Sequence, residues 1–429
     1  MGNIQVFKFG GASVKDPEHI ANVAHIINQN SNNKLAIVVS AIGKSTNAME
    51  EIVNAYFHQE NRTQDLLNQI KLKHLRIAQE CGINDEHALC DIMDTFVEVD
   101  WIIEDQVHDS YDYIYDQVVS VGEIVSTKII YYYLLNRKVN VAWLDIRGVL
   151  FTDEIHREAK VDWEYSTHRI KKEIDQLLTR YDCVITQGFI GSTRDNQTTT
   201  LGREGSDYSA AILSYCLDAE SMHIWKDVPG VLTGDPTIFE NVIKIDRMSY
   251  QEAIEMTYYG AKVIHPKTIK PIQNKSIPLF VRPYNQPNSM GTRIDGDNVL
   301  SYPPIIVVES NQCLVHISVK DFSFVAEHHM SNIFRIFSEL RIKVNMMRNT
   351  AISFSLCVSD DKDKLDQLLE KLGDTFLIVI DHGLELITIR HYQEPTIETL
   401  KEGKIVLFEE RLNQMMQMVV KDTPQVVRK

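Results

Sequence analysis

A polar stretch in the middle of the chain holds the residue types best suited to bind an anion. It runs from Thr186 to Ala211, beginning where the apolar strand pattern Cys183-Val184-Ile185 ends and closing at the start of a helical pattern. Open α/β sheets bind ligands in such loops, because the carboxyl ends of their strands face helix N-termini with free backbone N–H groups. Arg203 offers a planar fork for a carboxylate or a phosphate. The alternative is a threonine-rich surface loop in which Ser206 or Asp207 caps the following helix.

The first predicted strand, Ile4–Phe9, carries a second group of this kind. Lys8 lies near the end of the strand, Gly10-Gly11 follow it, and a helical pattern begins at Pro17. A lysine in this place can set its ammonium over phosphates that a glycine turn cradles. A glycine pair after a strand is also common in ordinary tight turns, so the argument depends on the lysine.

The second predicted strand, Leu35–Val39, leads into the hydroxyl-rich segment Ser40–Asn47. Within this segment Gly43-Lys44-Ser45 matches the end of a Walker A loop, but the first glycine of that motif would fall on Val38. We therefore exclude a P-loop. The segment remains a second hydroxyl-rich strand end, suited to a small substrate.

The composition is that of an ordinary globular protein with more than one domain. The chain has 429 residues, enough for two or three domains. Its net charge of −15 argues against a general affinity for nucleic acid or anionic lipid, which requires a basic surface. The six cysteines form neither CxxC pairs nor a metal-ligand spacing, which favours buried thiols in a reducing compartment. We find no basic leader and no apolar run long enough to span a bilayer, so we expect a cytoplasmic protein without a membrane partner.

Strand and helix patterns alternate over residues 1 to about 295, which predicts a doubly wound α/β domain. Residues 50–118 are helical and highly charged, and we expect them to form a helical lid or subdomain. Ser120–Glu123 then opens a helix that continues through Ile124–Leu135. In that first turn Glu123 either favours the helix dipole or binds a substrate ammonium.

The pattern changes beyond Tyr302-Pro303-Pro304. Residues 314–380 have the order β-α-β-β-α-β, which is typical of a ferredoxin-like module. A shorter copy follows, with strands at 384–391 and 404–409, a brief helix at 396–402 and an apolar tail at 415–420. No catalytic group of residues stands out in this part of the sequence.

Five motifs in series resemble aspartate kinase of the amino acid kinase superfamily. They are Lys8–Val14, Ser120–Glu123, Thr186–Ala211, Trp225–Gly230 and Gly260–Pro266. The resemblance implies an amino-acid-kinase-like doubly wound α/β catalytic domain over residues 1–298, with the helical subdomain at about 50–118. It also implies a regulatory region of tandem ferredoxin-like ACT modules over residues 305–429, the second module being truncated.

The resemblance further implies that the chain transfers the γ-phosphoryl group of ATP to the side-chain carboxylate of L-aspartate, with Mg²⁺ bridging the phosphates. This is the first step of lysine, threonine and methionine biosynthesis. The implied catalytic residues are Lys8 and Asp207. Asp207 would orient either Lys8 or the loop that carries Arg203. The residues implied for aspartate are Thr46, Glu123, Arg203 and Ser206, and those for ATP are Lys8, Gly10, Gly11, Lys226, Asp227 and Lys262. The family also leads us to expect a homodimer or higher homo-oligomer and an amino-acid effector at the ACT region.

Several positions depart from the commonest family pattern. Glu204 stands where glycine is usual, and we expect its side chain to point to solvent or to pair with a neighbouring base. Lys226 stands where threonine is frequent, and Thr237 stands where a basic residue that contacts ATP is frequent. We expect Lys226 to supply the positive charge that Thr237 lacks. In the ACT region Asn345 and Thr350-Ala351 replace the effector-contacting Asp and Ser-Glu. The loss of two carboxylates argues against inhibition by lysine.

Two other functions stay open on the sequence. One is an amino acid kinase that acts on a different carboxylate or on a carbamate. The other is a non-catalytic amino-acid sensor whose kinase domain only binds nucleotide. The complete set of Lys8, Glu123, Arg203 and Asp207 argues against the sensor, because a pure sensor needs no phosphoryl-transfer site.

Overall fold

The chain forms two compact units in the computed structural model, which describes residues 3–261, 264–297, 301–320 and 326–423. The first unit comprises the described parts of Met1–Val231, Lys244–Thr257 and Lys262–Val299. The second comprises the described parts of Leu232–Ile243, Tyr258–Ala261 and Leu300–Lys429. Five of the six cysteines are buried free thiols, as predicted, whereas Cys90 is exposed.

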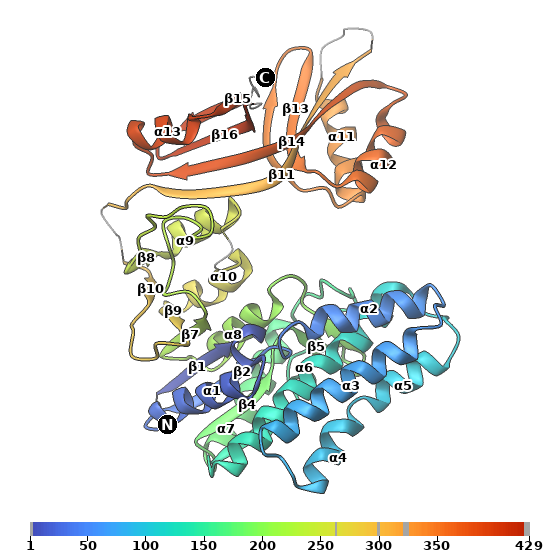
Figure 1. Ribbon diagram of the computed structural model, residues 1–429, viewed down its shortest axis with the longest axis vertical. Helices are drawn as coiled ribbons and strands as arrows, with labels where there is room; N and C mark the ends of the chain where they lie inside the picture. Colours follow the sequence, from blue (N-terminus) through green and yellow to red (C-terminus); the bar gives the residue numbers. More distant parts are fainter. Residues whose placement is uncertain (1–2, 262–263, 298–300, 321–325, 424–429) are drawn as a thin grey trace, which may run out of the picture. The chain divides into compact units, whose positions relative to one another are not determined.

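An eight-stranded sheet lies at the centre of the first unit and confirms the predicted doubly wound α/β fold (Figure 1). In spatial order its strands are β3 (Val141–Leu144), β4 (Cys183–Gln187), β2 (Lys34–Val39), β1 (Ile4–Phe9), β7 (Ser221–Lys226), β9 (Leu279–Pro283), β10 (Thr292–Asp295) and β8 (Arg247–Ser249). Neighbours from β3 to β9 run parallel, while β10 is antiparallel to β9 and parallel to β8. The run Leu35–Val39 is buried throughout, as expected of a central parallel strand covered on both faces.

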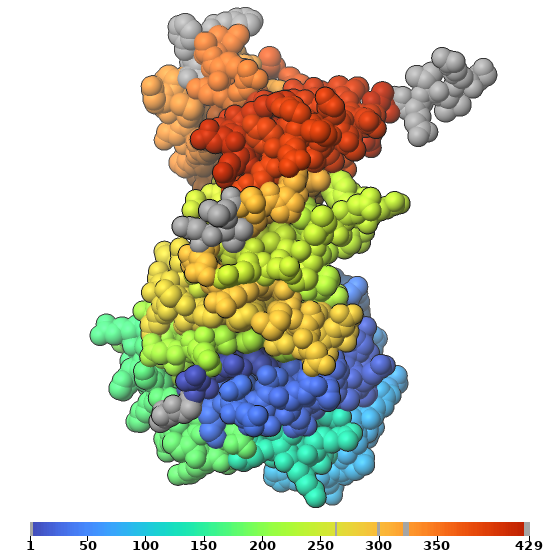
Figure 2. Space-filling view, turned by 90° about the vertical axis from the view of Figure 1, so that its left-hand side faces the viewer, coloured from blue at the N-terminus to red at the C-terminus, as the bar shows by residue number. Residues whose placement is uncertain are grey.

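Helices link these strands, and α1 (Pro17–Gln29) shows how the sequence sets their limits. The side chain of Asp16 accepts a hydrogen bond from the backbone N–H of His19 at 3.0 Å, and Pro17 fills the first helical position. On its outer side α1 meets the segment after β9, where the Asn22 side chain donates to the carbonyl of Tyr284 at 2.6 Å. Figure 2 shows the blue N-terminal segment bordering the yellow to orange residues of this part of the chain.

Four helices make up the predicted helical region: α2 (Ser45–Phe57), α3 (Thr63–Glu80), α4 (Glu86–Asp94) and α5 (Val97–Glu104). The apolar residues Ile92, Phe96 and Val99 follow one another at steps of four and three, but α4 ends at Asp94 and α5 begins at Val97. Phe96 and Val99 are nevertheless fully buried in the same core as the sheet. The region therefore packs as an extension of the first unit's core.

One helix is longer than the sequence predicts. α6 (Tyr111–Asn136) begins thirteen residues before Ile124, so Glu123 lies in its middle and the prediction of a first-turn position is wrong. α6 is also long and apolar enough to cross a membrane by length and composition, which corrects the expectation that no such run exists. Because 78% of the apolar stretch is buried inside the protein, the core of the first unit accounts for this composition.

The polar stretch after β4 forms a hairpin and then a helix. The hairpin strands are β5 (Ile190–Ser192) and β6 (Thr198–Thr200), and α8 (Gly205–Cys216) follows. α8 packs on β1, β2 and β7. The remaining helices of the first unit are η1 (Gly11–Val14), η2 (Ile146–Gly148), α7 (Trp163–Leu178), α9 (Tyr250–Tyr258) and α10 (Pro266–Asn274).

The second unit is built on a six-stranded antiparallel sheet. In spatial order its strands are β12 (Val344–Asn349), β13 (Ser353–Ser359), β11 (Ile305–Val319), β14 (Phe376–Arg390), β16 (Met415–Asp422) and β15 (Lys404–Leu412). Its helices are α11 (Glu327–Glu339), α12 (Lys362–Leu372) and α13 (Glu394–Lys401). The order β-α-β-β-α-β confirms the predicted ferredoxin-like, ACT-type pattern.

The two ferredoxin-like modules share their central strands. β11 and β14 have 15 residues each and pair along both halves of the sheet, with irregularities in register around residues 309–314. The last strand of the predicted 314–380 module and the strand predicted at 384–391 are therefore one, and the apolar tail 415–420 is a strand, β16. The second module is short because it shares β11 and β14 with the first and adds only β15, β16 and one helix, α13.

Candidate active site

The ends of four parallel strands place the predicted site residues at one edge of the first sheet. In the register of the sheet, Phe9 pairs with both Val39 and Trp225, and Val39 pairs with Gln187. The loops that follow β1, β2, β4 and β7 therefore start at the same level. Hydrogen bonds fix them together: Ser40 N–H donates to the Phe9 carbonyl at 3.1 Å, and Gly188 N–H donates to the Val39 carbonyl at 3.1 Å.

Glycines allow these loops to approach one another closely. A Cβ on Gly11 would lie 2.6 Å from the carbonyl oxygen of Ala41 and 2.7 Å from that of Gly43, so no side chain fits there. A Cβ on Gly188 would lie 2.6 Å from the Cβ of Ser206, on the first turn of α8. The glycine turn after β1 thus packs on the loop after β2, and the loop after β4 packs on α8.

A buried cluster of charges lies at this edge. The Lys8 ammonium is 2.6 Å from Asp207 Oδ1, and the Lys226 ammonium is 3.7 Å from Asp207 Oδ2. Lys8 and Asp207 are only 8% and 3% exposed. Burial alone would raise the pKa of Asp207, but the charges of Lys8 and Lys226 outweigh it and hold that pKa below its usual value. Asp207 is therefore ionised and keeps both ammonium groups in the site.

The first turn of α8 differs from the capped surface helix that the sequence left open. The N-cap residue is Glu204, with no side-chain capping hydrogen bond, and Ser206 and Asp207 lie inside the helix, buried in its first turn. A cap at Ser206 or Asp207 is thus wrong. Arg203 precedes the helix and is exposed, so its guanidinium is accessible to a ligand at the helix N-terminus.

Two placements were expected for the Glu204 side chain, in solvent or paired with a neighbouring base. The first is wrong, because Oε2 is buried and has no hydrogen-bond partner in the part of the chain that the structure describes. Burial and the charge of Asp207 raise the pKa of Glu204, and the charge of Lys226 opposes them. The side chain therefore lies at the charge cluster.

Glu123 brings a second carboxyl group to the site from the middle of α6. It is 2% exposed, and burial raises its pKa to about 8. Hydrogen bonds from the Ala41 N–H and the Thr46 hydroxyl, together with the charge of Lys8, lower the pKa of Glu123 against the effect of burial. All three groups therefore lie beside the carboxyl. Its Oε2 has no hydrogen-bond partner among the described residues. An incoming ammonium would satisfy that oxygen and stabilise the ionised form.

Glu123 belongs to a line of polar side chains along α6 that the sequence reading missed. Asp116, Ser120, Glu123 and Thr127 follow one another at steps of four, three and four, and none is more than 2% exposed. Their helical spacing within an otherwise apolar helix was the signal in the sequence that could have identified this line. Asp116 accepts hydrogen bonds from the Thr200 hydroxyl at 2.6 Å and the Thr200 N–H at 3.1 Å, which anchors β6 just before Arg203.

Some predicted residues are exposed or lie outside the described residues. Asp227 is exposed in the loop after β7, and Lys262 lies outside the described residues. Thr237 is an exposed residue of the second unit, where its hydroxyl donates to Asp235 at 2.6 Å. The structure thus brings together Lys8, Gly10, Gly11, Thr46, Glu123, Ser206, Asp207 and Lys226, with Arg203 on the exposed side.

The predicted effector positions lie in the second unit on β12 and just after it. The Asn345 amide donates to the buried Gln312 side chain at 2.9 Å, and Asn345 Oδ1 is buried with no hydrogen-bond partner in the described ranges. Thr350 is exposed and hydrogen-bonds Ser353 across the turn between β12 and β13. An uncharged amide therefore stands where the family has a carboxylate.

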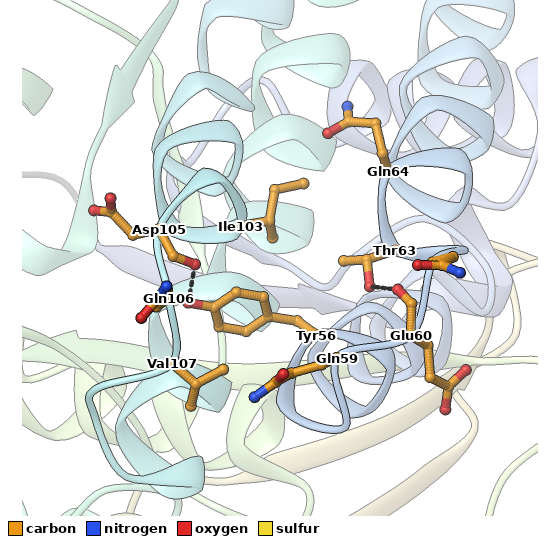
Figure 3. A pocket seen from close by; sticks show the side chains of 10 residues that line it. Tyr56, Gln59, Glu60, Thr63, Gln64, Ile103, Asp105, Gln106 and Val107 are labelled. Carbon is orange, nitrogen blue, oxygen red and sulfur yellow. Dashed lines mark hydrogen bonds between the residues drawn. The ribbon is translucent and has the colours of Figure 1, made fainter.

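A separate cavity of about 500 Å³ lies in the helical region (Figure 3). It is bounded by the end of α2, the start of α3 and the segment after α5. The Tyr56 hydroxyl donates to the Asp105 carbonyl at 3.0 Å, and the Thr63 hydroxyl donates to the Glu60 carbonyl at 2.9 Å. None of the predicted site residues lines this cavity, and we assign no chemistry to it.

Known proteins resemble the chain over nearly its whole length. A sequence profile of the amino acid kinase family matches residues 3–283. Lysine-sensitive aspartokinase 3 of Escherichia coli is 30% identical over 91% of this chain and 87% of its own length, and aspartokinase 1 of Arabidopsis thaliana chloroplasts is 28% identical over 96% and 74%. The crystal structure of E. coli aspartokinase III with aspartate and ADP superposes with a TM-score of 0.82, at 26% identity over 97% of this chain and 96% of that one.

Proposed function

The chain belongs to the amino acid kinase family, and on that premise we propose how its residues carry out the aspartate kinase reaction. The chain phosphorylates the side-chain carboxylate of L-aspartate with ATP, giving 4-phospho-L-aspartate at the head of aspartate-derived amino acid biosynthesis. The observation that supports the assignment of residues is the Lys8–Asp207–Lys226 cluster at the N-terminus of α8, in which Lys8 and Asp207 are buried and Lys226 is half-buried.

Lys8 stabilises the negative charge on the transferring phosphoryl group. Phosphoryl transfer demands positioning and charge stabilisation from a protein, and little covalent chemistry. The Asp207 carboxylate, 2.6 Å away, keeps the Lys8 side chain fixed before the substrates bind. A Cβ on Gly10 would lie 3.5 Å from the Lys8 ammonium, so the glycine turn runs directly beside the group that receives the phosphates.

Aspartate lies between α8 and α6. Arg203 and Ser206 hold its carboxylates, using the guanidinium fork and the first turn of α8. Glu123 Oε2, which has no hydrogen-bond partner among the described residues, accepts a hydrogen bond from the substrate ammonium, whose charge stabilises the ionised carboxylate after its proton passes to solvent. Thr46, whose hydroxyl reaches the Glu123 carboxyl, contacts a carboxylate oxygen from the start of α2.

Lys226, Asp227 and Lys262 contact the nucleotide. Within the described ranges no three His, Cys, Asp or Glu side chains are placed to hold a metal ion. Mg²⁺ at kinase sites is held mainly by phosphate oxygens and water, with one or two carboxylates, so Asp207 as the ionised carboxylate of the site fits this role. When bound, Mg²⁺ neutralises charge between the phosphates.

Hydroxamate formation tests the proposal. ATP, Mg²⁺, L-aspartate and hydroxylamine are supplied to the parent, to Lys8→Ala and to Lys15→Ala, which removes an exposed lysine just after the same glycine turn. We expect the parent and Lys15→Ala to form product, and Lys8→Ala to lose about 10²- to 10³-fold in kcat. ATP binding without product from aspartate under any condition would instead favour a sensor, and product from glutamate or acetylglutamate alone would favour a different amino acid kinase.

We also propose that the second unit binds an amino-acid effector and that the chain forms a homodimer or higher homo-oligomer. The E. coli relative is named as lysine-sensitive, and a structure of it contains lysine and aspartate. In this chain Asn345 replaces a carboxylate, so we expect lysine to inhibit weakly or not at all. Adding lysine, threonine or methionine to the hydroxamate assay checks the effector, and sedimentation velocity checks the assembly.

A further inference from the structure

α6 carries a buried carboxylate two turns before Glu123. Asp116 is fully buried. Because it precedes Glu123 by seven residues, it lies on the same side of the helix, about 10 Å away along the axis. None of the proposed substrate contacts involves Asp116. A carboxylate is costly to bury unless hydrogen bonds satisfy it, so its partners show what this position does.

Asp116 is hydrogen-bonded to two segments that lie far from it in the sequence. Its Oδ1 accepts from the Thr200 hydroxyl at 2.6 Å, and its Oδ2 accepts from the Thr200 N–H at 3.1 Å. Oδ2 also accepts from the Arg157 N–H at 3.1 Å and lies 2.9 Å from Nδ1 of His156. One carboxylate thus joins α6, the strand β6 and the loop that contains residues 156–157.

Both of these segments lead to Arg203. The strand β6 ends at Thr200, three residues before Arg203. A Cβ on Gly202 would lie 3.0 Å from the carbonyl oxygen of Arg157, so the residue directly before Arg203 packs on the residue whose N–H is bound by Asp116. The backbone that carries Arg203 is therefore attached to α6 by two routes through the same carboxylate.

The other side of Glu123 is fixed as well. The Ser126 hydroxyl donates to the Ser40 carbonyl, just after β2, at 2.7 Å. The Thr127 hydroxyl accepts from the amide of Gln187, at the end of β4, at 2.8 Å. Held before and after Glu123, α6 acts as a rigid spacer. It sets how far Glu123 lies from the loop at the start of α8.

We propose that Asp116 is a positioning residue that sets the distance between Glu123 and Arg203, and that this distance selects aspartate over the longer glutamate. The inference deepens the proposed function and rests on it, because it takes Glu123 as the partner of the substrate ammonium and Arg203 as the partner of a carboxylate. Two fixed binding groups engage a substrate together only when its own charges have the matching separation. One extra methylene group typically changes kcat/KM by about 10- to 200-fold.

The test loosens the spacer at its hydrogen bonds. Thr200→Val removes the hydroxyl and keeps the shape, Thr200→Ser keeps the hydroxyl, and Asp116→Asn removes the negative charge. The measurements are KM for aspartate, the inhibition constant of L-glutamate as a competitor of aspartate, and the dissociation constant of ATP with Mg²⁺ by calorimetry.

We expect Thr200→Val and Asp116→Asn to raise KM for aspartate about tenfold, because the two ends of the site no longer match the substrate. Glutamate does not fit both ends in the parent and has less to lose, so its inhibition constant should stay within about twofold. ATP binding should stay within the same range, since the spacer holds only the aspartate end of the site. Thr200→Ser should behave like the parent.

Thr199→Val is the matched control. Thr199 is the neighbouring residue of β6 and equally buried, but its hydroxyl forms a hydrogen bond of 2.7 Å with that of Thr152 and none with α6 among the described residues. Both valine variants should lower the midpoint of thermal unfolding, because each loses a buried hydrogen bond. Thr199→Val should nevertheless leave KM for aspartate within about twofold of the parent.

The proposal is overturned if KM for aspartate stays within twofold of the parent in both Thr200→Val and Asp116→Asn. It is overturned equally if glutamate loses affinity in proportion to aspartate, or if Thr199→Val raises KM as much as Thr200→Val, since the site would then be loosened as a whole. Failure of the proposed function gives a different result, in which the parent itself forms no aspartyl hydroxamate. Calorimetry with aspartate and glutamate then makes the same comparison, and a parent that binds aspartate no more tightly than glutamate overturns the spacing too.

Discussion

The protonation state of Glu123 should make kcat/KM for aspartate depend on pH. Its pKa is raised to about 8 by burial, so roughly one molecule in ten carries the ionised carboxylate at pH 7 and nine in ten at pH 9. Ionising the group at pH 7 costs about 1.4 kcal/mol. If the substrate ammonium binds the ionised form, kcat/KM for aspartate should rise about tenfold from pH 7 to pH 9.

The assay is the initial rate at saturating ATP over pH 6.5 to 9, with aspartate varied. At saturating aspartate the bound ammonium keeps Glu123 ionised, so kcat should change much less than kcat/KM. Glu123→Gln keeps the shape and removes the charge, and its profile should be flat near the low-pH level of the parent. The control Glu104→Gln makes the same change at an exposed residue at the end of α5 and should keep the rise.

The reasoning is refuted if kcat/KM of the parent varies less than threefold between pH 7 and pH 9. It is refuted equally if Glu123→Gln retains the rise of the parent, since another group would then control the profile.

Three further predictions concern the same edge of the sheet. Gly188→Ala places a Cβ 2.6 Å from that of Ser206, so kcat/KM for aspartate should fall about 10- to 100-fold, with ADP affinity, measured by calorimetry, nearly unchanged. Arg203→Lys keeps the charge but loses the bidentate fork, and KM for aspartate should rise about tenfold, with Arg194→Lys, at an exposed arginine in the loop between β5 and β6, as the silent control. Because the folded state holds the Glu123 proton to higher pH than the unfolded chain, the free energy of unfolding of the parent should decline between about pH 5 and pH 8, and denaturant titrations of Glu123→Gln should lack this share of the decline.

Local patterns in the sequence were enough for the strands, most helix positions and the residues at strand ends. Lys8, with the glycine pair that follows it, could be assigned to a phosphate site because the strand, the turn and the helix are contiguous in the chain. The start of α6 could not be found this way. Asp116, Ser120 and Glu123 are polar and look like a break in an apolar helix, although each lies on its buried side.

Contacts between distant segments decided the rest of the site. Asp116 and Thr200 are 84 residues apart and form one hydrogen-bonded unit. Glu204 was expected either in solvent or paired with a neighbouring base, because the sequence shows only a charged residue in a loop, and in the folded chain one of its carboxyl oxygens is buried at the start of α8. Charge and burial of this kind depend on which strands lie side by side.

The sequence by itself determined the residue types, the strand-to-helix junctions that carry them and the order of the family motifs. Only the tertiary structure decided which charges share a buried space: two lysines from β1 and β7 on one aspartate of α8, with carboxyl groups from α6 and from the helix N-cap beside them. The physical reason is that spacing along the chain fixes local geometry, whereas pKa values, ion pairs and unpartnered atoms depend on solvent exclusion by segments that meet only in the folded chain.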